Sequence, residues 1–157
     1  PYMRKGKKIL FIILIPLLFV SCGYQPMFKN MSNLNFIITV KNFSGDEDIN
    51  KLIKSNLTKY KSNEDGIKNY NVNFNSNYKK IIISKDTKGN ATRYEIQINI
   101  KFVISSGEFE KEFNYTESFN MEKNNDILEE QDYEKTIKNS LVNIVVKKLI
   151  RQLSQIK

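Results

Sequence analysis

Cysteine and histidine carry much of the nucleophilic and metal-binding chemistry of proteins, and this sequence contains one cysteine, Cys22, and no histidine. Serine–histidine and cysteine–histidine nucleophile systems are therefore excluded, as are metal sites built from histidines or from several cysteines. A single thiol also cannot form a disulfide within the chain. The sequence predicts no catalytic residue, no metal site and no cofactor.

Three glutamates, Glu108, Glu110 and Glu112, alternate along one predicted strand and so share one of its faces. Such a row could imitate the paired carboxylates of a glycosidase, which act as acid and as base or nucleophile. Like charges at this spacing on an exposed strand are more often simply solvated. A carboxylate hydrolase is accordingly the weakest functional alternative, and it would need two facing acids in a cleft.

Basic residues gather around one predicted hairpin that has few acids: Lys79, Lys80, Lys85, Lys88 and Arg93. Ammonium and guanidinium groups bind phosphates through charge-assisted hydrogen bonds, so the cluster would suit a glycolipid phosphate. The simpler interpretation is that these side chains protect a strand edge and keep the loop soluble. Both interpretations stay open. The neighbouring asparagines, Asn71, Asn73, Asn75 and Asn77, likewise fit either a polar binding surface or a solvent face.

The single cysteine stands at the end of an apolar run. Residues 9–20 are apolar, four basic residues precede them, and Ser21-Cys22-Gly23 follows. The run is too short for a bilayer span, which takes about 20 residues, so a secretion signal is the better interpretation. The segment resembles the lipobox of bacterial lipoproteins, with Phe19 in place of the usual leucine.

This resemblance implies that residues 1–21 are removed and that Cys22 is acylated, which would anchor the protein to a membrane. Gly23, where an aspartate often signals retention in the inner membrane, implies the periplasmic face of the outer membrane. The alternative is a plain signal peptide with a chance cysteine.

Loss of residues 1–21 leaves 136 of the 157 residues, enough for one domain with one core. It also leaves 21 basic and 17 acidic residues, so the net charge falls from +8 to +4. These charges are dispersed along the chain, and an exported protein meets no nucleic acid. We therefore expect no nucleic-acid partner.

Hydrophobic periodicity predicts six elements in the remaining chain. Strands are expected over residues 34–40, 70–84, 94–104 and 109–121, with a bulge in the second near Lys79-Lys80. Helices are expected from Asp46 to Tyr60 and from Asp126 or Asp132 to the end. The apolar stripe expected on the last helix comprises Tyr133, Ile137, Leu141, Ile144, Val145, Leu149, Leu153 and Ile156.

A helix joins the first two strands, which predicts that they are parallel, while short turns make the later pairs antiparallel. The predicted fold is α+β: a two-layer sandwich with two helices packed on one face of a four-stranded mixed sheet. We expect a signal peptide over 1–21, a lipidated tether over 22–33 and one domain over 34–157.

The heptapeptide Cys22-Gly23-Tyr24-Gln25-Pro26-Met27-Phe28 resembles the mature start of the LPS-assembly lipoprotein LptE, in its alphaproteobacterial form. Met27 and Phe28 are mild departures from that pattern, and the order of the predicted elements also agrees. The resemblance implies a noncatalytic outer-membrane lipoprotein that plugs the LptD β-barrel, assists its assembly and helps lipopolysaccharide reach the cell surface. The alternative is a free-standing periplasmic lipid carrier, which would keep a hydrophobic pocket between helices and sheet.

Overall fold

The computed structural model describes residues 36–60 and 68–156. In chain order the elements are β1 (Phe36–Gly45), α2 (Glu47–Thr58), β2 (Lys68–Lys85), β3 (Ala91–Ser106), β4 (Phe109–Glu122) and α3 (Ile127–Ser154). The predicted signal peptide over 1–21, the tether over 22–33 with Cys22, and Leu34 lie outside the described residues. The signal peptide, the tether and the lipidation of Cys22 therefore stay predictions.

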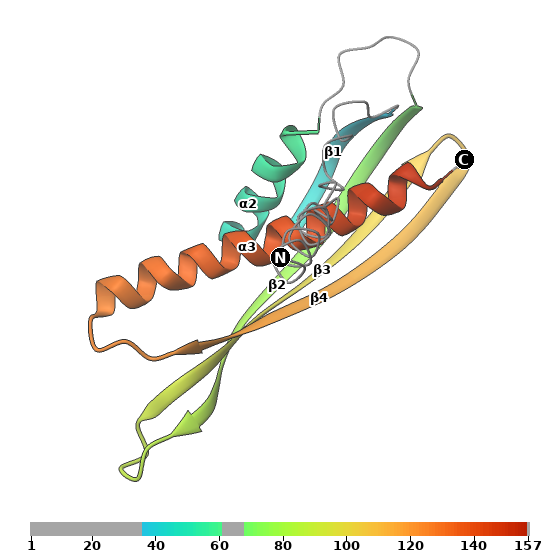
Figure 1. Cartoon of the computed structure of the whole chain (residues 1–157). Coiled ribbons are helices and arrows are strands. Elements are labelled where there is room, and N and C mark those ends of the chain that lie inside the picture. The colour runs from blue at the N-terminus through green and yellow to red at the C-terminus, as the bar shows by residue number, and fades with distance from the viewer. Residues whose placement is uncertain (1–35, 61–67, 157) are drawn as a thin grey trace, which may run out of the picture. The chain divides into compact units, whose positions relative to one another are not determined.

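The four strands form one sheet in the order β1-β2-β3-β4. The β1–β2 pair is parallel, and the β2–β3 and β3–β4 pairs are antiparallel. Both helices lie on the same face of the sheet, where α2 packs against β1 and β2, α3 packs against β3 and β4, and the two helices contact each other (Figure 1). The predicted α+β sandwich is confirmed.

The junction between β1 and α2 is a tight turn that needs a glycine. Gly45 has a φ of 98°, and a Cβ on this residue would lie 1.8 Å from the carbonyl oxygen of Ser76. The next amide, that of Asp46, donates to the same oxygen at 3.1 Å. Asp46 then caps α2 by accepting the amide of Ile49 at 2.9 Å. The predicted helix start is confirmed.

Helix α3 begins at the first of the two predicted caps. The carboxylate of Asp126 accepts the amides of Leu128 and Glu129 at 2.8 and 3.2 Å. Asp132 lies inside the helix, where its backbone carbonyl accepts the hydroxyl of Thr136 at 3.0 Å. Asp126, rather than Asp132, is therefore the N-cap of α3.

The apolar stripe predicted for α3 is partly wrong. Tyr133 and Ile144 are 49% and 40% exposed, whereas Val142, Val146 and Ile150 are buried. The helix packs on a sheet and on α2 at once, so its buried arc is wider than one row of side chains. The other buried members were predicted: Ile137, Leu141, Val145, Leu149 and Leu153.

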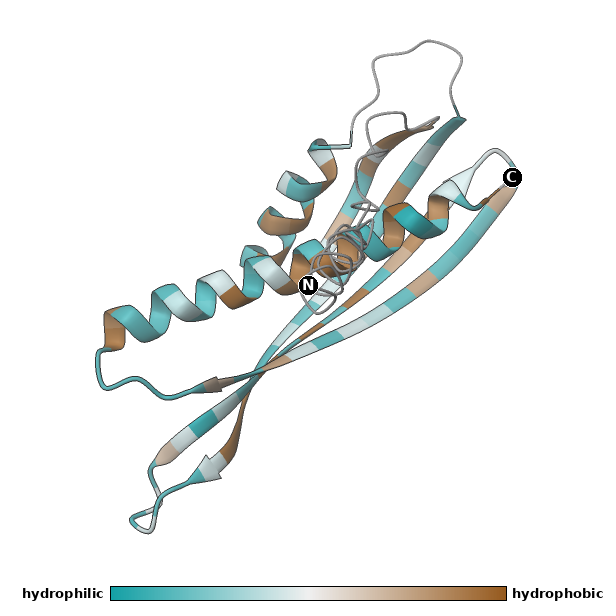
Figure 2. Ribbon diagram, viewed as in Figure 1, coloured by the Kyte–Doolittle hydropathy of each residue, from teal (hydrophilic) through white to brown (hydrophobic). Residues whose placement is uncertain are grey.

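The core lies between the sheet and the helices. Strand β3 supplies its centre, because every second side chain from Ile96 to Ile104 is fully buried. The alternation of apolar and polar positions along the strands is visible in Figure 2. On β4 only Met121 is fully buried, and Phe119 is 44% exposed at the edge of the sheet.

The bulge predicted near Lys79-Lys80 is misplaced. These residues pair regularly with Gln97 and Ile96, and the register shifts later, between Ile82 and Lys85. The irregularity thus falls at the outer end of the hairpin, where neither helix constrains the pairing.

Candidate functional site

The predicted phosphate-binding side chains lie on the β2–β3 hairpin, but not on one face. Lys79 and Lys80 are consecutive on β2 and point to opposite sides of the sheet, and Arg93 lies across the hairpin on β3. Lys85 ends β2, and Lys88 stands in the turn. All five residues are exposed, but some of them already pair with a carboxylate and the others pair with none in the described part of the chain.

Lys80 forms ion pairs with two glutamates of α3. Its Nζ lies 2.8 Å from Glu130 Oε1 and 2.9 Å from Glu134 Oε2, and its side chain is 28% exposed. Burial alone would lower the pKa of Lys80, but hydrogen bonds to the two carboxylates raise it above its ordinary value. The ammonium therefore fastens the hairpin to the helix and is already neutralised locally.

Glu134 is the centre of this contact. Its Oε1 accepts the hydroxyl of Tyr78 at 2.6 Å and also lies 3.1 Å from Lys138 Nζ. Burial by itself would raise the pKa of Glu134, yet the bonds from Tyr78, Lys80 and Lys138 lower it. The pKa of Tyr78 is raised, first by burial and then by its bond to Glu134. One carboxylate thus accepts three donors, two of them cations.

The turn at the end of the hairpin is closed by hydrogen bonds to one side chain, that of Asp86. Asp86 Oδ1 accepts the amides of Lys88 and Asn90 at 2.9 and 2.8 Å, and Gly89 takes a positive φ of 86°. Lys88, Gly89 and Asn90 thus lie in the turn that joins β2 to β3. Lys79, Lys85 and Lys88 make no ion pair with another described residue, while Arg93 lies 3.6 Å from Glu122.

The face of the sheet away from the helices is polar. Asn73 Oδ1 accepts the Asn42 amide at 3.1 Å, and the side chain of Asn75 donates to Ser44 at 2.8 Å. The asparagine row therefore links β2 to β1 and presents amide groups rather than net charge. A polar binding face and a solvated face would both look like this.

Of the predicted row of glutamates, Glu110 and Glu112 lie on the outer side of the β3–β4 pair, whereas Glu108 lies in the turn before β4. Glu110 and Glu112 stand opposite Ser105 and Val103, and Glu112 pairs with Lys101 at 2.8 Å. All three glutamates are exposed. Within residues 36–60 and 68–156, no group of three or more acidic, histidine or cysteine side chains could hold a metal ion.

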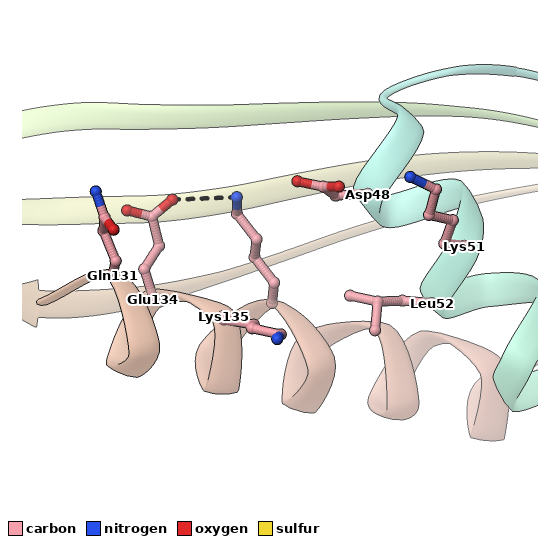
Figure 3. A pocket seen from close by; sticks show the side chains of 7 residues that line it. Asp48, Lys51, Leu52, Gln131, Glu134 and Lys135 are labelled. Atoms are coloured by element: carbon pink, nitrogen blue, oxygen red, sulfur yellow. Dashed lines mark ion pairs between the residues drawn. The ribbon is translucent and has the colours of Figure 1, made fainter. Parts of the chain in front are cut away.

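A groove of about 510 Å³ separates the beginning of α2 from the first half of α3 (Figure 3). Its lining is mostly charged: Asp48, Lys51, Leu52, Gln131, Glu134, Lys135 and Lys138. A smaller groove of about 280 Å³ between β4 and α3 is more apolar, with Phe119, Tyr133 and Ile144 on its wall. The space between the helices and the sheet holds one continuous cluster of buried side chains.

Sequence analysis missed the partners of the hairpin lysines. Glu130, Glu134 and Lys138 follow one another at intervals of four on α3, so they share one side of the helix. That spacing indicates a charged contact on this side of α3. It does not identify Lys80 and Tyr78 as the residues that the helix binds.

No protein-family model matches this chain, and no curated protein matches it significantly. Its fold does match solved structures. Rare lipoprotein B from Shewanella oneidensis superposes with a TM-score of 0.53 at 10% identity, covering 74% of this chain and 94% of that one. A Caulobacter crescentus protein designated a lipoprotein gives 0.52 at 9% identity, covering 79% and 89%. The chain therefore has the fold of rare lipoprotein B.

In the described part of the chain, no helix is both long and apolar enough to cross a membrane.

Proposed function

We propose that this chain is a noncatalytic lipoprotein of the LptE type, anchored through Cys22 at the periplasmic face of the outer membrane. In this role it binds and plugs the LptD β-barrel, assists its assembly and helps lipopolysaccharide reach the cell surface. The observation that carries the proposal is the sandwich fold it shares with rare lipoprotein B, which is LptE. The heptapeptide from Cys22 to Phe28 supports the same family independently of the fold.

The surface of the domain suits a polar lumen. The asparagine row on β2 offers donors and acceptors without net charge, and it is tied to β1 by the bonds of Asn73 and Asn75. A preorganised polar face loses little side-chain entropy when it meets another polar wall. Binding across this face would leave the helices and their core intact.

The hairpin supplies cations for glycolipid phosphates. Lys79, Lys85 and Lys88 are the predicted contacts that remain available, because Lys80 pairs with Glu130 and Glu134 and Arg93 pairs with Glu122. Exposed lysines contact phosphate as point charges, so we expect their contribution to weaken as salt is added.

The packed interior argues against the lipid-carrier alternative. A carrier would need an apolar cavity between helices and sheet, and that space holds buried side chains. Of the two grooves described above, the larger is mainly charged, and the more apolar one measures about 280 Å³.

The deciding experiment is purification of the native complex. The full chain carries a C-terminal tag, outer membranes are solubilised in mild detergent, and the copurifying components are quantified. One large β-barrel at one-to-one stoichiometry is the expected result. Recovery of the chain alone with bound lipid would overturn the proposal in favour of the carrier.

A Lys79→Glu/Lys85→Glu/Lys88→Glu variant should keep the barrel and lose bound glycolipid, while Lys41→Glu/Lys135→Glu should keep both.

A further inference from the structure

Strand β2 continues well past the strand that pairs with it on one side. Its parallel pairing with β1 ends at Gly45 and Ser76, because the chain turns there into α2. The strand itself runs on to Lys85, and through most of this stretch it is paired with β3 (Figure 1). On its other side, residues 77–85 pair with no strand in the described part of the chain.

The open edge carries an apolar segment. Ile81, Ile82 and Ile83 are consecutive, and they are 39%, 49% and 42% exposed. Single exposed apolar residues are common, but three adjacent β-branched residues on an unpaired edge form a template for another strand. The segment lies in the brown stretch of the protruding hairpin in Figure 2.

Charges flank this segment at both ends. Lys79 precedes the isoleucines and Lys85 follows them, and neither forms an ion pair with another described residue. Residues directly opposite on neighbouring strands lie about 5 Å apart, close enough for opposite charges to attract. The edge is therefore apolar in its middle and cationic at its ends.

We propose that residues 77–85 bind an extended segment of another protein by strand addition. That segment would be apolar opposite the isoleucines and would carry carboxylates opposite Lys79 and Lys85. Backbone hydrogen bonds would supply affinity, and the side-chain pairs would supply selectivity. The proposal does not rest on the barrel-plug function, although Lys79 and Lys85 are also two of the lysines proposed above to contact glycolipid phosphates. Peptide binding in the absence of glycolipid separates the two roles.

A second copy of this chain fits the edge poorly. Antiparallel pairing centred on Ile82 sets every isoleucine against an isoleucine, but it also sets Lys79 against Lys85 twice. Parallel pairing in register sets each lysine against its own copy. Both registers that match all the isoleucines thus oppose like charges, which destabilises strand pairing.

The test uses the full chain in mild detergent and two synthetic peptides of alternating valine and threonine, one ending in glutamates and the other in lysines. Binding is measured by fluorescence anisotropy and located by amide hydrogen exchange. We expect the acidic peptide to bind and to protect amides within residues 77–85. The Lys79→Glu/Lys85→Glu variant should bind it at least about tenfold more weakly and should prefer the basic peptide.

Lys41→Glu/Lys135→Glu is the matched control, since it makes the same charge change at exposed positions on β1 and α3. It should bind the acidic peptide like the unmodified chain. Absence of peptide binding, or protection along β4 instead, would overturn the proposal. So would concentration-dependent self-association that protects residues 77–85, or binding to anionic phosphatidylglycerol vesicles without peptide binding.

Discussion

The hydroxyl of Tyr78 donates to Glu134 Oε1 at 2.6 Å and so joins β2 to α3 across 56 positions of sequence. The ring of the same tyrosine lies under Lys138, whose Nζ is 4.1 Å from the ring centroid. The hairpin and the long helix are thereby held by a polar contact rather than by the core alone. This contact leads to the first two predictions.

Replacement of Tyr78 by phenylalanine should destabilise the fold by about 1–3 kcal/mol, because the mutation removes a hydrogen bond to a carboxylate. Urea unfolding followed by circular dichroism measures the change. Tyr133→Phe is the control, since Tyr133 is half exposed and its ring packs edge-on against Phe119. Equal stability losses in the two variants would contradict the role given to the Tyr78 hydroxyl.

The same contact predicts sensitivity to acid. The pKa of Glu134 is lowered in the folded state, so its stabilising effect is complete above its ordinary value and is lost as pH falls through the folded value. The ordinary pKa of a glutamate side chain is 4.5, so the loss should develop below that pH. Glu134→Gln should flatten the dependence of the urea midpoint on pH in this window. A Glu134→Gln variant that keeps the slope of the unmodified protein would contradict this role of Glu134.

Gly45 and Gly89 provide a matched pair for a backbone prediction. Both have positive φ, 98° and 86°, but a Cβ on Gly45 meets Ser76 whereas a Cβ on Gly89 meets nothing within 4 Å. Gly89→Ala should lower the free energy of unfolding only by the conformational strain of a positive φ, about 1–2 kcal/mol. Gly45→Ala should cost clearly more, or prevent folding, because backbone atoms must also move. Chemical denaturation of the two variants compares them directly, and similar losses would refute the close approach at Gly45.

Helix capping offers a prediction for α3. Asp126→Ala should destabilise the protein by about 0.5–2 kcal/mol, because the amides of Leu128 and Glu129 lose their acceptor. Asp132→Ala should change stability little, since only the backbone of Asp132 takes part in a described hydrogen bond. Thermal unfolding distinguishes the two, and a larger loss at Asp132 would show that the helix starts later.

Acylation of Cys22 is tested by chemistry rather than by stability. The unmodified chain should incorporate labelled palmitate, and mass spectrometry should place the lipid on a terminus that begins at Cys22. Cys22→Ala should abolish incorporation and release the protein from the membrane fraction. Incorporation that survives the substitution would exclude this residue as the anchor.

The elements that the sequence predicted best are those with an uninterrupted local pattern. The alternation from Tyr94 to Ile104 defines β3, and Asp46 followed by two acidic residues defines the start of α2. The direction of each strand pair also followed from local information, since connection lengths decide which pairs are parallel. In each case neighbouring residues in the sequence contain the necessary information.

What escaped prediction depends on distant contacts. Tyr133 and Ile144 are exposed where they line the groove beside β4, the edge strand, and no helical repeat encodes that position. Lys80 was grouped with Lys79 as a surface cation, although it is Glu130 and Glu134, some fifty residues later, that bind it. The register shift at Ile82 likewise depends on its pairing partners in β3.

The mixed connectivity of the sheet has a consequence for the order of assembly. Strands β2, β3 and β4 follow one another through short turns, so their pairing closes small loops and has low contact order. The β1–β2 pair must first close a loop that contains all of α2, which costs more chain entropy. The three-stranded meander is thus the part of the sheet that local encounters can build, and β1 joins a template that already exists.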